Sequence, residues 1–443
     1  MRALLVQPFG HHKGHPWASA AYLSRALAEA GADIVLVTYD GLLDETGRQT
    51  NVSQISVVSQ RGPLGLMARS INRALRLVRL FRPLIPLVET ASTFLLAFRE
   101  GKEREKNHAN VLHVLDGSLT PASFVVLAAA TRRRALALTL SHPPLERYVR
   151  GTSIELSRSV GGRLSLLSRL QSLTLPSSVA DYLYRRAKAK NRIAFVAHSP
   201  YVQEAHVHAP FHEDIVCIPW GVGAFHDEKL TETEAREHLG LREIGTILLS
   251  FGVNHPRKDF EVIFQAVKDL RKDFTLLFAG DVLEQDKQYN DPRRFAEEYG
   301  WSAQTIVEDR HITERELPYY FHAADAIILS YKREFVGASG VLSLASEFGL
   351  PVIASDAGQL GEFVREFNLG LVFAAEDAES LREAICAFLC LDEDQRQEIG
   401  QNLQAFASAH SWREVAKQHL ELYQSLSEGN LNGSKEMSQR GSC

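Results

Sequence analysis

The chain has 443 residues, of which 45% are hydrophobic and 23% charged, and its formal net charge is −5. The composition is ordinary for a soluble globular protein, and the length predicts two or three domains of roughly 100–200 residues each. The mildly acidic balance gives no electrostatic reason to expect nucleic-acid binding, and no apolar run approaches the ~20 residues of a membrane-spanning helix.

The first forty residues predict a strand, a loop, a helix ending at Gly31 and a second strand. The short apolar run before Gln7 and Pro8 reads as this first strand, because it is too short for a signal-peptide core. The order strand–helix–strand predicts a parallel sheet with a right-handed crossover. Further strand-like runs occupy 110–117, 134–142, 192–199 and 214–222, interrupted by basic helical stretches near 62–100 and 150–190.

A second alternating series begins near residue 244 and predicts a second Rossmann-like sheet. Its expected strands and helices are 244–252, 260–272, 274–282, 314–324, 325–332, 340–348, 369–377 and 378–390. The sequence therefore predicts an α/β fold of two Rossmann-like domains, whose parallel sheets face each other across a cleft.

The segment between the two series is charged and carries few large apolar residues, so we expect a linker with a surface helix there. Apolar spacing from Trp412 to Tyr423 predicts a packed final helix, and the polar tail after it is typical of disorder. The expected parts are an N-terminal domain, linker, C-terminal domain, final helix and tail, at 1–225, 226–243, 244–410, 411–426 and 427–443.

Cysteine and histidine spacing predicts neither a disulfide framework nor a metal site. Cys386 and Cys390 share one face of a predicted helix, where packing is more common than bonding. The absence of a disulfide framework predicts a cytoplasmic protein. His11, His12 and His15 fit no closed zinc site, and no Cys or acidic residue accompanies them, so no metal is expected.

Ligands of open α/β sheets bind beyond the carboxyl ends of the strands, so the loops that follow strands are the candidate sites. Gly14 lets the backbone approach a phosphate at a helix start, although its loop lacks the GxGxxG pattern and also suits an ordinary turn. His142 directly follows an apolar strand. It can bind a hydroxyl or share its proton there, or it is only a hydrogen-bonded loop residue.

Two loops of the second series have the character of an anion site. His255, Arg257 and Lys258 cluster after the first strand of that series, where cations suit a diphosphate better than they suit a solvated turn. Ser339 and Gly340 stand where a helix begins, and the free N–H groups and dipole of such an end favour anions. A tight turn of a Rossmann fold needs some of the same glycines, so this loop alone decides nothing.

These stretches together resemble the family-4 retaining glycosyltransferases of the GT-B fold, the group 1 glycosyl transferases. The resemblance covers most of the chain and is strongest from about residue 195. It is carried by the order and spacing of "CIPWGVG" (217–223), "FGVNHPRKDFEVIFQA" (251–266), the stretch 317–364, "NLGLVF" (368–373) and "HSWREVAKQHLELYQSL" (410–426).

The resemblance implies that the second domain holds a sugar nucleotide, the first domain holds the acceptor, and the final helix returns to the first domain. By position, Lys258 matches the family lysine on the donor diphosphate, and His142 matches the histidine near the transferred sugar. Gly14 falls in the loop that approaches the sugar phosphate. The implied co-substrate is a UDP- or GDP-linked sugar, with no further cofactor, since a fixed cation and helix N–H groups can stabilise the leaving diphosphate.

The sequence departs from the family's Glu-x7-Glu pattern. Counted back from Pro351, its two positions fall on Val336 and Leu344. Leu344 cannot hold the ribose, which identifies an atypical branch. Glu334 lies two residues early and is a candidate near the sugar, whereas Glu347 is expected only on the helix surface.

The family's usual arginine before the lysine is also missing, with Val253 and His255 at the candidate positions, and His255 or Arg257 is expected to supply the charge. Branches that read "SGV" in place of the glutamate look catalytic, which favours activity over a pseudoenzyme. The predicted catalytic residues are Lys258, His142 and His255, and the predicted donor-binding residues are Gly14, Arg257, Lys258, Glu334, Ser339, Gly340 and Val341.

Two basic stretches of the predicted acceptor domain suggest an anionic membrane surface as a partner. One is a predicted amphipathic helix, 69–82, with arginines at spacings of three and four, and the other is 184–192. Ordinary surface helices with solvated or paired arginines explain the same pattern. If the membrane interpretation holds, the protein is cytoplasmic and peripheral at the inner face of the membrane.

The sequence therefore predicts a retaining glycosyltransferase that moves a sugar from a nucleotide-diphosphate sugar to a glycan or lipid-linked acceptor in surface polysaccharide or glycolipid synthesis. The role rests on family analogy alone. A non-catalytic sugar-nucleotide-binding protein of the same fold is the alternative. A sugar-nucleotide epimerase is a third reading, and it requires more acidic residues than the predicted cleft contains.

Overall fold

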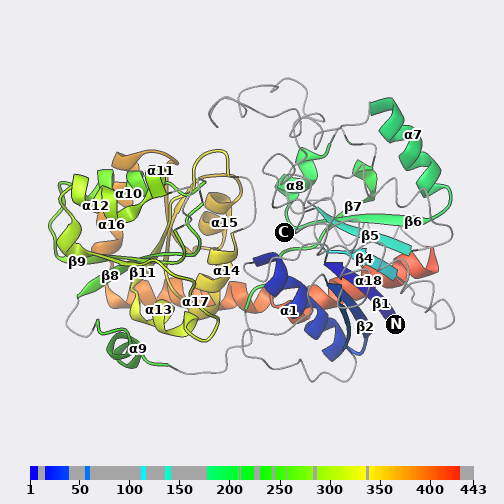
Figure 1. The fold of residues 1–443 in the computed structure, drawn as a ribbon, viewed down its shortest axis with the longest axis horizontal. Helices are drawn as coiled ribbons and strands as arrows, with labels where there is room; N and C mark the ends of the chain where they lie inside the picture. The colour runs from blue at the N-terminus through cyan, green and yellow to red at the C-terminus, as the bar shows by residue number, and fades with distance from the viewer. Residues whose placement is uncertain are drawn as a thin grey trace, which may run out of the picture. The chain divides into compact units, whose positions relative to one another are not determined.

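The computed structural model describes residues 1–7, 15–38, 55–59, 111–115, 135–140, 177–207, 209, 211–223, 230–241, 245–255, 257–282, 287–335 and 339–429. The chain divides into two compact units (Figure 1). Unit 1 combines Met1–Trp220 with Trp412–Cys443, and unit 2 is Gly221–Ser411. Both units are built on a parallel sheet with helices on its faces, which confirms the predicted α/β architecture.

Unit 1 contains a seven-stranded sheet in the order β3-β2-β1-β4-β5-β6-β7, and all its described pairings are parallel. Its strands are β1 (Arg2–Gln7), β2 (Asp33–Thr38), β3 (Ile55–Ser59), β4 (Val111–Val114), β5 (Ala135–Leu140), β6 (Arg192–Ala197) and β7 (Ile215–Cys217). Its helices are α1 (His15–Glu29), α7 (Ser177–Lys188), α8 (Pro200–Ala205), the short 3-10 helix η3 (His212–Asp214) and α18 (Trp412–Glu428).

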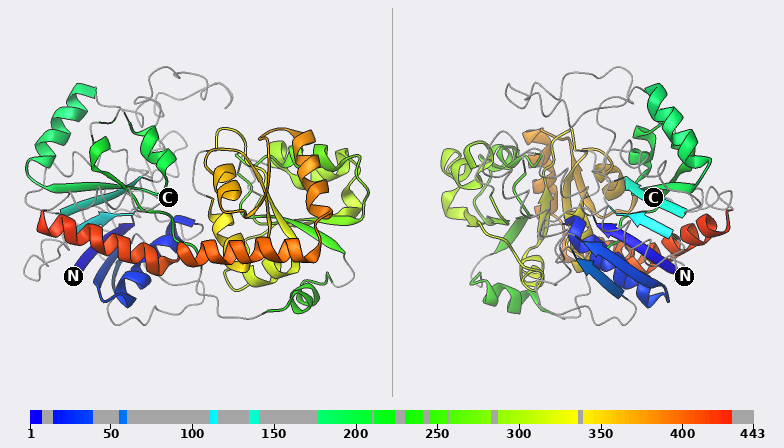
Figure 2. Two further views of the ribbon diagram at one scale, coloured as in Figure 1. Left: turned by 180° about the vertical axis from the view of Figure 1, so that it is seen from behind. Right: turned by 45° about the vertical axis from the view of Figure 1, so that its right-hand side comes forward.

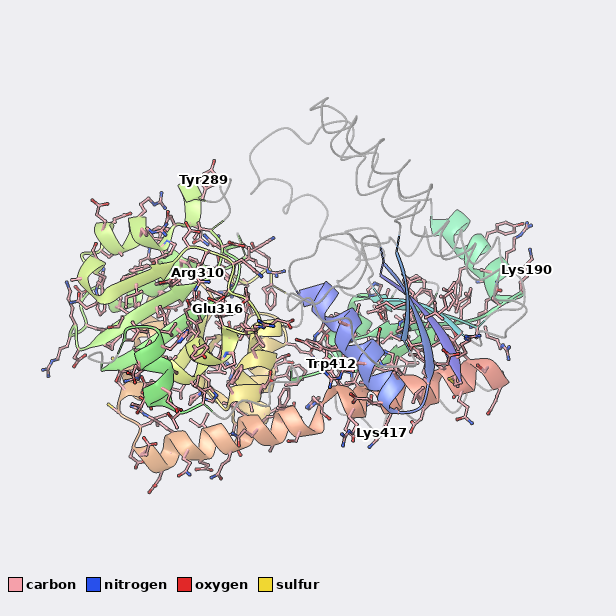
Figure 3. All side chains as sticks on the ribbon, turned by 60° about the horizontal axis from the view of Figure 1, so that its bottom comes forward. Lys190, Tyr289, Arg310, Glu316, Trp412 and Lys417 are labelled. Atoms are coloured by element: carbon pink, nitrogen blue, oxygen red, sulfur yellow. The ribbon has the colours of Figure 1, made fainter. Side chains whose placement is uncertain are left out.

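Helices α1 and α18 pack on one face of this sheet, and α7 and α8 pack on the other. Alternate strand residues such as Leu136 and Ala137 enter opposite cores, as expected for strands buried on both faces. Figure 2 shows α18 running along the sheet of unit 1, and Figure 3 shows Trp412 at its start beside α1. The Trp412 ring lies 5.8 Å from the ring of Tyr22 on α1, so the final helix is part of this core.

A buried polar group joins α18 to the middle of the unit 1 sheet. His113 on β4 lies with Nδ1 2.6 Å from the Tyr423 hydroxyl and Nε2 2.9 Å from Thr139 Oγ1. The ring of His419 stacks 5.5 Å from that of His113. Burial lowers the pKa of His113 well below its usual range and lowers the pKa of His419 to about 4. Both rings are therefore neutral near pH 7.

Unit 2 contains a six-stranded parallel sheet in the order β10-β9-β8-β11-β12-β13. Its strands are β8 (Thr246–Phe251), β9 (Phe274–Ala279), β10 (Thr305–Glu308), β11 (Ala326–Leu329), β12 (Val352–Ser355) and β13 (Gly370–Phe373). Its helices are α9 (Glu232–His238), α10 (Phe260–Val267), α11 (Lys287–Asn290), α12 (Pro292–Glu298), η4 (Ser302–Gln304), α13 (Leu317–Ala323), α14 (Gly340–Phe348), α15 (Leu360–Glu366), α16 (Ala378–Leu389) and α17 (Glu393–Ala409).

The helices of unit 2 form two layers around its sheet (Figure 1). Apolar residues of α10, α12 and α16 cover one face, and those of α13, α14, α15 and α17 cover the other. The predicted end of α14 is confirmed, because Gly349 adopts φ +66 after Phe348 and β12 begins at Val352. Leu344 packs against the core, as its apolar side chain requires.

The described segment 230–241 lies inside unit 2 and includes helix α9, where the sequence predicted a linker with a surface helix. Most residues of α9 are exposed. Its half-buried Arg236 forms an ion pair with Asp325, with Nη2 and Oδ2 2.8 Å apart, and also donates from Nε to the Ala323 carbonyl at 2.9 Å. The sequence placed domain boundaries at residues 225 and 410, and in the structure the chain passes between the units after Trp220 and after Ser411.

Cys386 on α16 and Cys390 at its C-cap are free thiols, but Cys386 is only half-buried and Cys390 is exposed, so the expected packing role is wrong for Cys390. Cys217 is disulfide-bonded, which the sequence analysis did not anticipate. Among the described helices, none is both long and apolar enough to cross a membrane.

Candidate functional site

The loops after β8 and β11 meet where the strand order of unit 2 reverses. Both strands are central and parallel, and ligands of such sheets bind beyond the carboxyl ends at this position. The two loops are hydrogen-bonded to each other, since Asp259 N donates to the Ser330 carbonyl at 2.7 Å and Lys332 N donates to the Arg257 carbonyl at 2.8 Å. An antiparallel bridge therefore pairs Lys258 with Tyr331.

Lys258 turns its side chain back toward the end of β8. Its ammonium group donates a hydrogen bond to the Phe251 carbonyl, and the residue is only 8% exposed. A Cβ placed on Gly252 meets Lys258 Nζ at 3.3 Å and Val341 Cγ2 at 3.7 Å. The ammonium group thus lies beside the first turn of α14.

The surroundings of Lys258 disfavour its charged form. Burial is the main cause and the nearby positive charge of Arg257 adds to it, so the pKa falls from 10.5 to about 7. No carboxylate pairs with Lys258 among its described contacts. An anion at this position therefore supplies the missing counter-charge and favours protonation of the lysine.

Helix α14 presents its N-terminus at the same place. Ser339 is the N-cap, and its Oγ accepts a hydrogen bond from Leu342 N at 3.2 Å. The first N–H groups of a helix have no acceptor within the helix, and here Gly340 and Val341 provide them. The helix dipole and these N–H groups favour a negative charge beside Lys258.

Aromatic side chains support the helix start and Arg257. The buried hydroxyl of Tyr331 lies 3.2 Å from Ser339 Oγ, and the Tyr331 ring stacks on Phe335 at a centroid distance of 4.0 Å. The Arg257 guanidinium lies 5.5 Å from the Phe335 ring centroid while the residue stays exposed. This cation–π contact holds a second positive charge at the rim of the site.

Two glycines set the backbone of this region, and the sequence analysis singled out neither of them. Gly252 adopts φ +93, and a Cβ on Gly280 would lie 2.5 Å from the Gly252 carbonyl oxygen. The ends of β8 and β9 can therefore approach each other only with glycine at 280. In the sequence, each of these glycines directly follows an apolar strand, and this position could have identified them.

The other sequence-predicted residues fall in different environments. His255 is exposed, and its Nδ1 accepts a hydrogen bond from Arg257 N at 3.3 Å across a tight turn. Glu334 is exposed in the loop before α14, and Glu347 is half-buried on that helix. Gly14, His142, Val336 and Gly337 lie outside the described residues.

Within the described part of the chain, no three His, Cys, Asp or Glu residues are grouped so that they could hold a metal ion. The charged side chains placed at the site, Lys258 and Arg257, are cationic. The N–H groups at the start of α14 add partial positive charge. The arrangement can bind an anion with two or more phosphate oxygens and stabilise negative charge that develops on it.

Residues 231–406 match the family model described as Glycosyl transferases group 1. A D-inositol 3-phosphate glycosyltransferase of Nocardia farcinica is 29% identical over 195 residues, which cover 43% of this chain and 42% of the relative. The chain spans about a quarter to a half of the length of the curated relatives it matches.

Solved structures show the fold of the whole chain. Sucrose-phosphate synthase of Thermosynechococcus elongatus gives a TM-score of 0.64 at 19% identity, covering 96% of this chain and 99% of that one. HepE of Anabaena in complex with UDP gives 0.64 at 16% identity, covering 96% and 100%. The fold is therefore the two-domain α/β GT-B fold predicted from the sequence. The likeness to the group 1 glycosyl transferases lies in residues 231–406, where the family model matches.

Proposed function

We propose that the protein is a retaining glycosyltransferase of the family-4 type that uses a nucleotide-diphosphate sugar. The observation that carries the proposal is the position of Lys258 Nζ between the end of β8 and the start of α14, within a segment that matches the family. In this assignment the diphosphate accepts hydrogen bonds from Lys258 and from the N–H groups of Gly340 and Val341. The relatives' names, which describe glycosyltransferases, favour catalysis over the non-catalytic alternative.

The proposed reaction breaks the bond between the anomeric carbon and the diphosphate oxygen and forms a bond from that carbon to an acceptor oxygen on the same face. The leaving nucleoside diphosphate keeps the electron pair and receives the acceptor's proton. Lys258 and the α14 N–H groups stabilise the charge that develops on the leaving group, which is where transition-state stabilisation is most effective. No metal ion is required for these steps, because fixed cations supply the positive charge.

The proposed acceptor is a glycan or lipid-linked acceptor of surface polysaccharide or glycolipid synthesis, and we propose that unit 1 binds it. His142 keeps its proposed role near the transferred sugar, and Gly14 keeps its proposed role near the sugar phosphate. The proposed membrane contact through 184–192 is narrower than the sequence suggested. Tyr184 is buried, Lys188 pairs with Asp214 at 2.7 Å, Lys190 and Arg192 are half-buried, and Arg185 and Arg186 are exposed. The other stretch, 69–82, lies outside the described residues.

A thermal-shift panel of UDP, GDP, ADP and their sugars tests the donor assignment. Binding to the folded state at a hundred times the dissociation constant raises stability by ~2.7 kcal/mol, so one nucleotide class should raise the melting temperature. Slow release of free sugar from the matching nucleotide sugar, lost in Lys258→Ala, establishes catalysis. Binding without hydrolysis or transfer to any acceptor pool supports the non-catalytic alternative, and no stabilisation by any nucleotide contradicts the donor assignment.

Recovery of the protein with anionic vesicles tests the membrane contact separately. Sedimentation with anionic vesicles and not with neutral ones is expected, and the bound fraction should fall in the double variant Arg185→Ala/Arg186→Ala. Equal recovery in the supernatant with and without anionic lipid contradicts the membrane contact and leaves the donor site unaffected.

A further inference from the structure

The amide of Asn290, at the end of α11, bonds to both ends of the loop that carries Lys258. Its Nδ2 donates to the Lys258 carbonyl at 2.9 Å and to Asn254 Oδ1 at 2.7 Å. Its Oδ1 accepts from Phe260 N at 3.2 Å. The Asn290 side chain thus connects Asn254, near the start of the loop, with Lys258 and Phe260 at its end.

Asn254 in turn donates a hydrogen bond to Asn290. Its Nδ2 donates to the main-chain carbonyl of Asn290, and its own N–H donates to the Asp281 carbonyl at 2.9 Å. Asn254 is 1% exposed and Asn290 is 8% exposed. The two amides therefore form a reciprocal, buried pair, which we term the asparagine clamp.

The orientation of the clamp is specific to its two residues. Their chain neighbours Val253 and Tyr289 are 42% and 71% exposed, and Figure 3 shows Tyr289 pointing away from unit 2. Val253 and Tyr289 thus face the surface, whereas the side chains of Asn254 and Asn290 turn inward. Their side-chain hydrogen bonds join the two amides to each other, to the carbonyls of Lys258 and Asn290, and to Phe260 N at the start of α10.

The clamp adds a third set of hydrogen bonds to the backbone around Lys258. Lys258 N donates to the His255 carbonyl at 2.8 Å, its neighbours on both sides bond to the β11 loop, and Asn290 holds its carbonyl. A shift of this backbone moves Nζ away from Phe251 and the start of α14, and displacement of a reacting group by about 1 Å can cost a hundredfold in rate.

We infer that Asn254 and Asn290 are positioning residues that hold Lys258 in the donor-diphosphate site. The inference deepens the proposed function and rests on it for its consequence in nucleotide binding. Neither asparagine touches the donor in this account, and each acts through the lysine.

The test follows the Lys258 ammonium group by NMR titration of the full-length, lysine-labelled protein, with the Lys258 signal assigned by its loss in Lys258→Met. Asn290→Ala is expected to open the lysine to solvent and to move its pKa up from about 7 toward 10.5. Calorimetry with UDP should show roughly tenfold weaker binding, as expected when hydrogen bonds to a charged group are misaligned. Asn254→Ala should raise the Lys258 pKa and weaken UDP binding by smaller amounts. If Asn290→Ala does not fold, Asn254→Ala provides the test.

Asn191→Ala is the matched control. Asn191 is 5% exposed in unit 1 and donates from Nδ2 to the Ala187 carbonyl at 3.2 Å. This variant should lower the melting temperature but leave the Lys258 titration and UDP binding unchanged. Clamp variants whose Lys258 titration matches wild type overturn the inference. If wild type binds no UDP, GDP or ADP, the proposed function fails, and the Lys258 titration still decides the clamp.

Discussion

The ammonium group of Lys258 donates to the main-chain carbonyl of Phe251, seven residues earlier, so the lysine folds back over the end of its own strand. A buried lysine with a neutral acceptor loses much of its hydration and gains only a partial compensation. We therefore propose that the lysine binds an anion, which the N–H groups of α14 also contact.

Replacement of Lys258 should weaken nucleotide binding strongly without unfolding unit 2. Lys258→Ala is expected to weaken UDP binding and nucleotide-sugar hydrolysis by about a hundredfold, the usual effect of losing one preorganised donor to developing charge. Lys268→Ala, at the exposed C-cap of α10, is the control of equal charge change. Equal losses in both variants, measured by calorimetry and sugar release, contradict a specific role for Lys258.

Stability should rise with pH because of the same lysine. Its pKa is about 7 in the folded chain and near 10.5 when unfolded, so between these values only the unfolded state is protonated. The free energy of unfolding of wild type, relative to Lys258→Met, should therefore increase by up to about 1.4 kcal/mol per pH unit from 7 to 10.5. Urea titrations of both proteins across this range measure the difference, and a flat difference contradicts the buried environment.

Gly252 should be required for UDP binding as well as for the backbone conformation at this position. Gly252→Ala strains a φ of +93 and places a Cβ 3.3 Å from Lys258 Nζ. Gly240→Ala strains a φ of +70 with no atom within 4 Å of the new Cβ. Both variants should lose about 1 kcal/mol of stability, but only Gly252→Ala should also weaken UDP binding. Equal UDP affinities in the two variants count against the proximity of Gly252 to the bound anion.

The polar group between β4 and α18 should make unit 1 sensitive to acid. The pKa of His419 is about 4 in the folded chain against 6.5 for an ordinary histidine, so between these values only the unfolded state is protonated. Stability should therefore fall as pH drops from 6.5 toward 4, and His419→Leu should reduce this slope. Tyr423→Phe, which removes the 2.6 Å contact to His113, should cost about 1–2 kcal/mol at pH 7. Tyr182→Phe, on the exposed face of α7, is its control and should cost nothing measurable.

Local patterns in the sequence predicted the parallel sheets, the helix at 340–348 and its stop at Gly349, because strand and helix periodicity and glycine stops are read over a few residues. The approach of Lys258 to α14 was expected in outline, since loops after adjacent parallel strands share one edge. His255 was expected to act in catalysis, and this role stays a prediction; its side chain is exposed, and its Nδ1 accepts a hydrogen bond from Arg257 N.

Contacts between distant segments could not be read from the sequence. Asn254 and Asn290 are 36 residues apart and belong to no recognisable motif, so their pairing depends on how β8 and α11 pack. His113 and Tyr423 are separated by 310 residues, and their hydrogen bond exists only because α18 belongs to unit 1. Charge in 226–243 predicted a linker with a surface helix, but not the ion pair of Arg236, because its partner Asp325 lies far along the chain.

The most direct test of the central claim is the number of protons taken up when UDP binds at pH 8, measured by calorimetry in buffers of different ionisation enthalpy. Lys258 is mostly neutral in the free protein at this pH, since its pKa is about 7, and a bound diphosphate should protonate it. The account predicts uptake approaching one proton per UDP in wild type and none in Lys258→Met. Binding of UDP without proton uptake, or equal uptake in the two proteins, contradicts the assignment of Lys258 to the diphosphate.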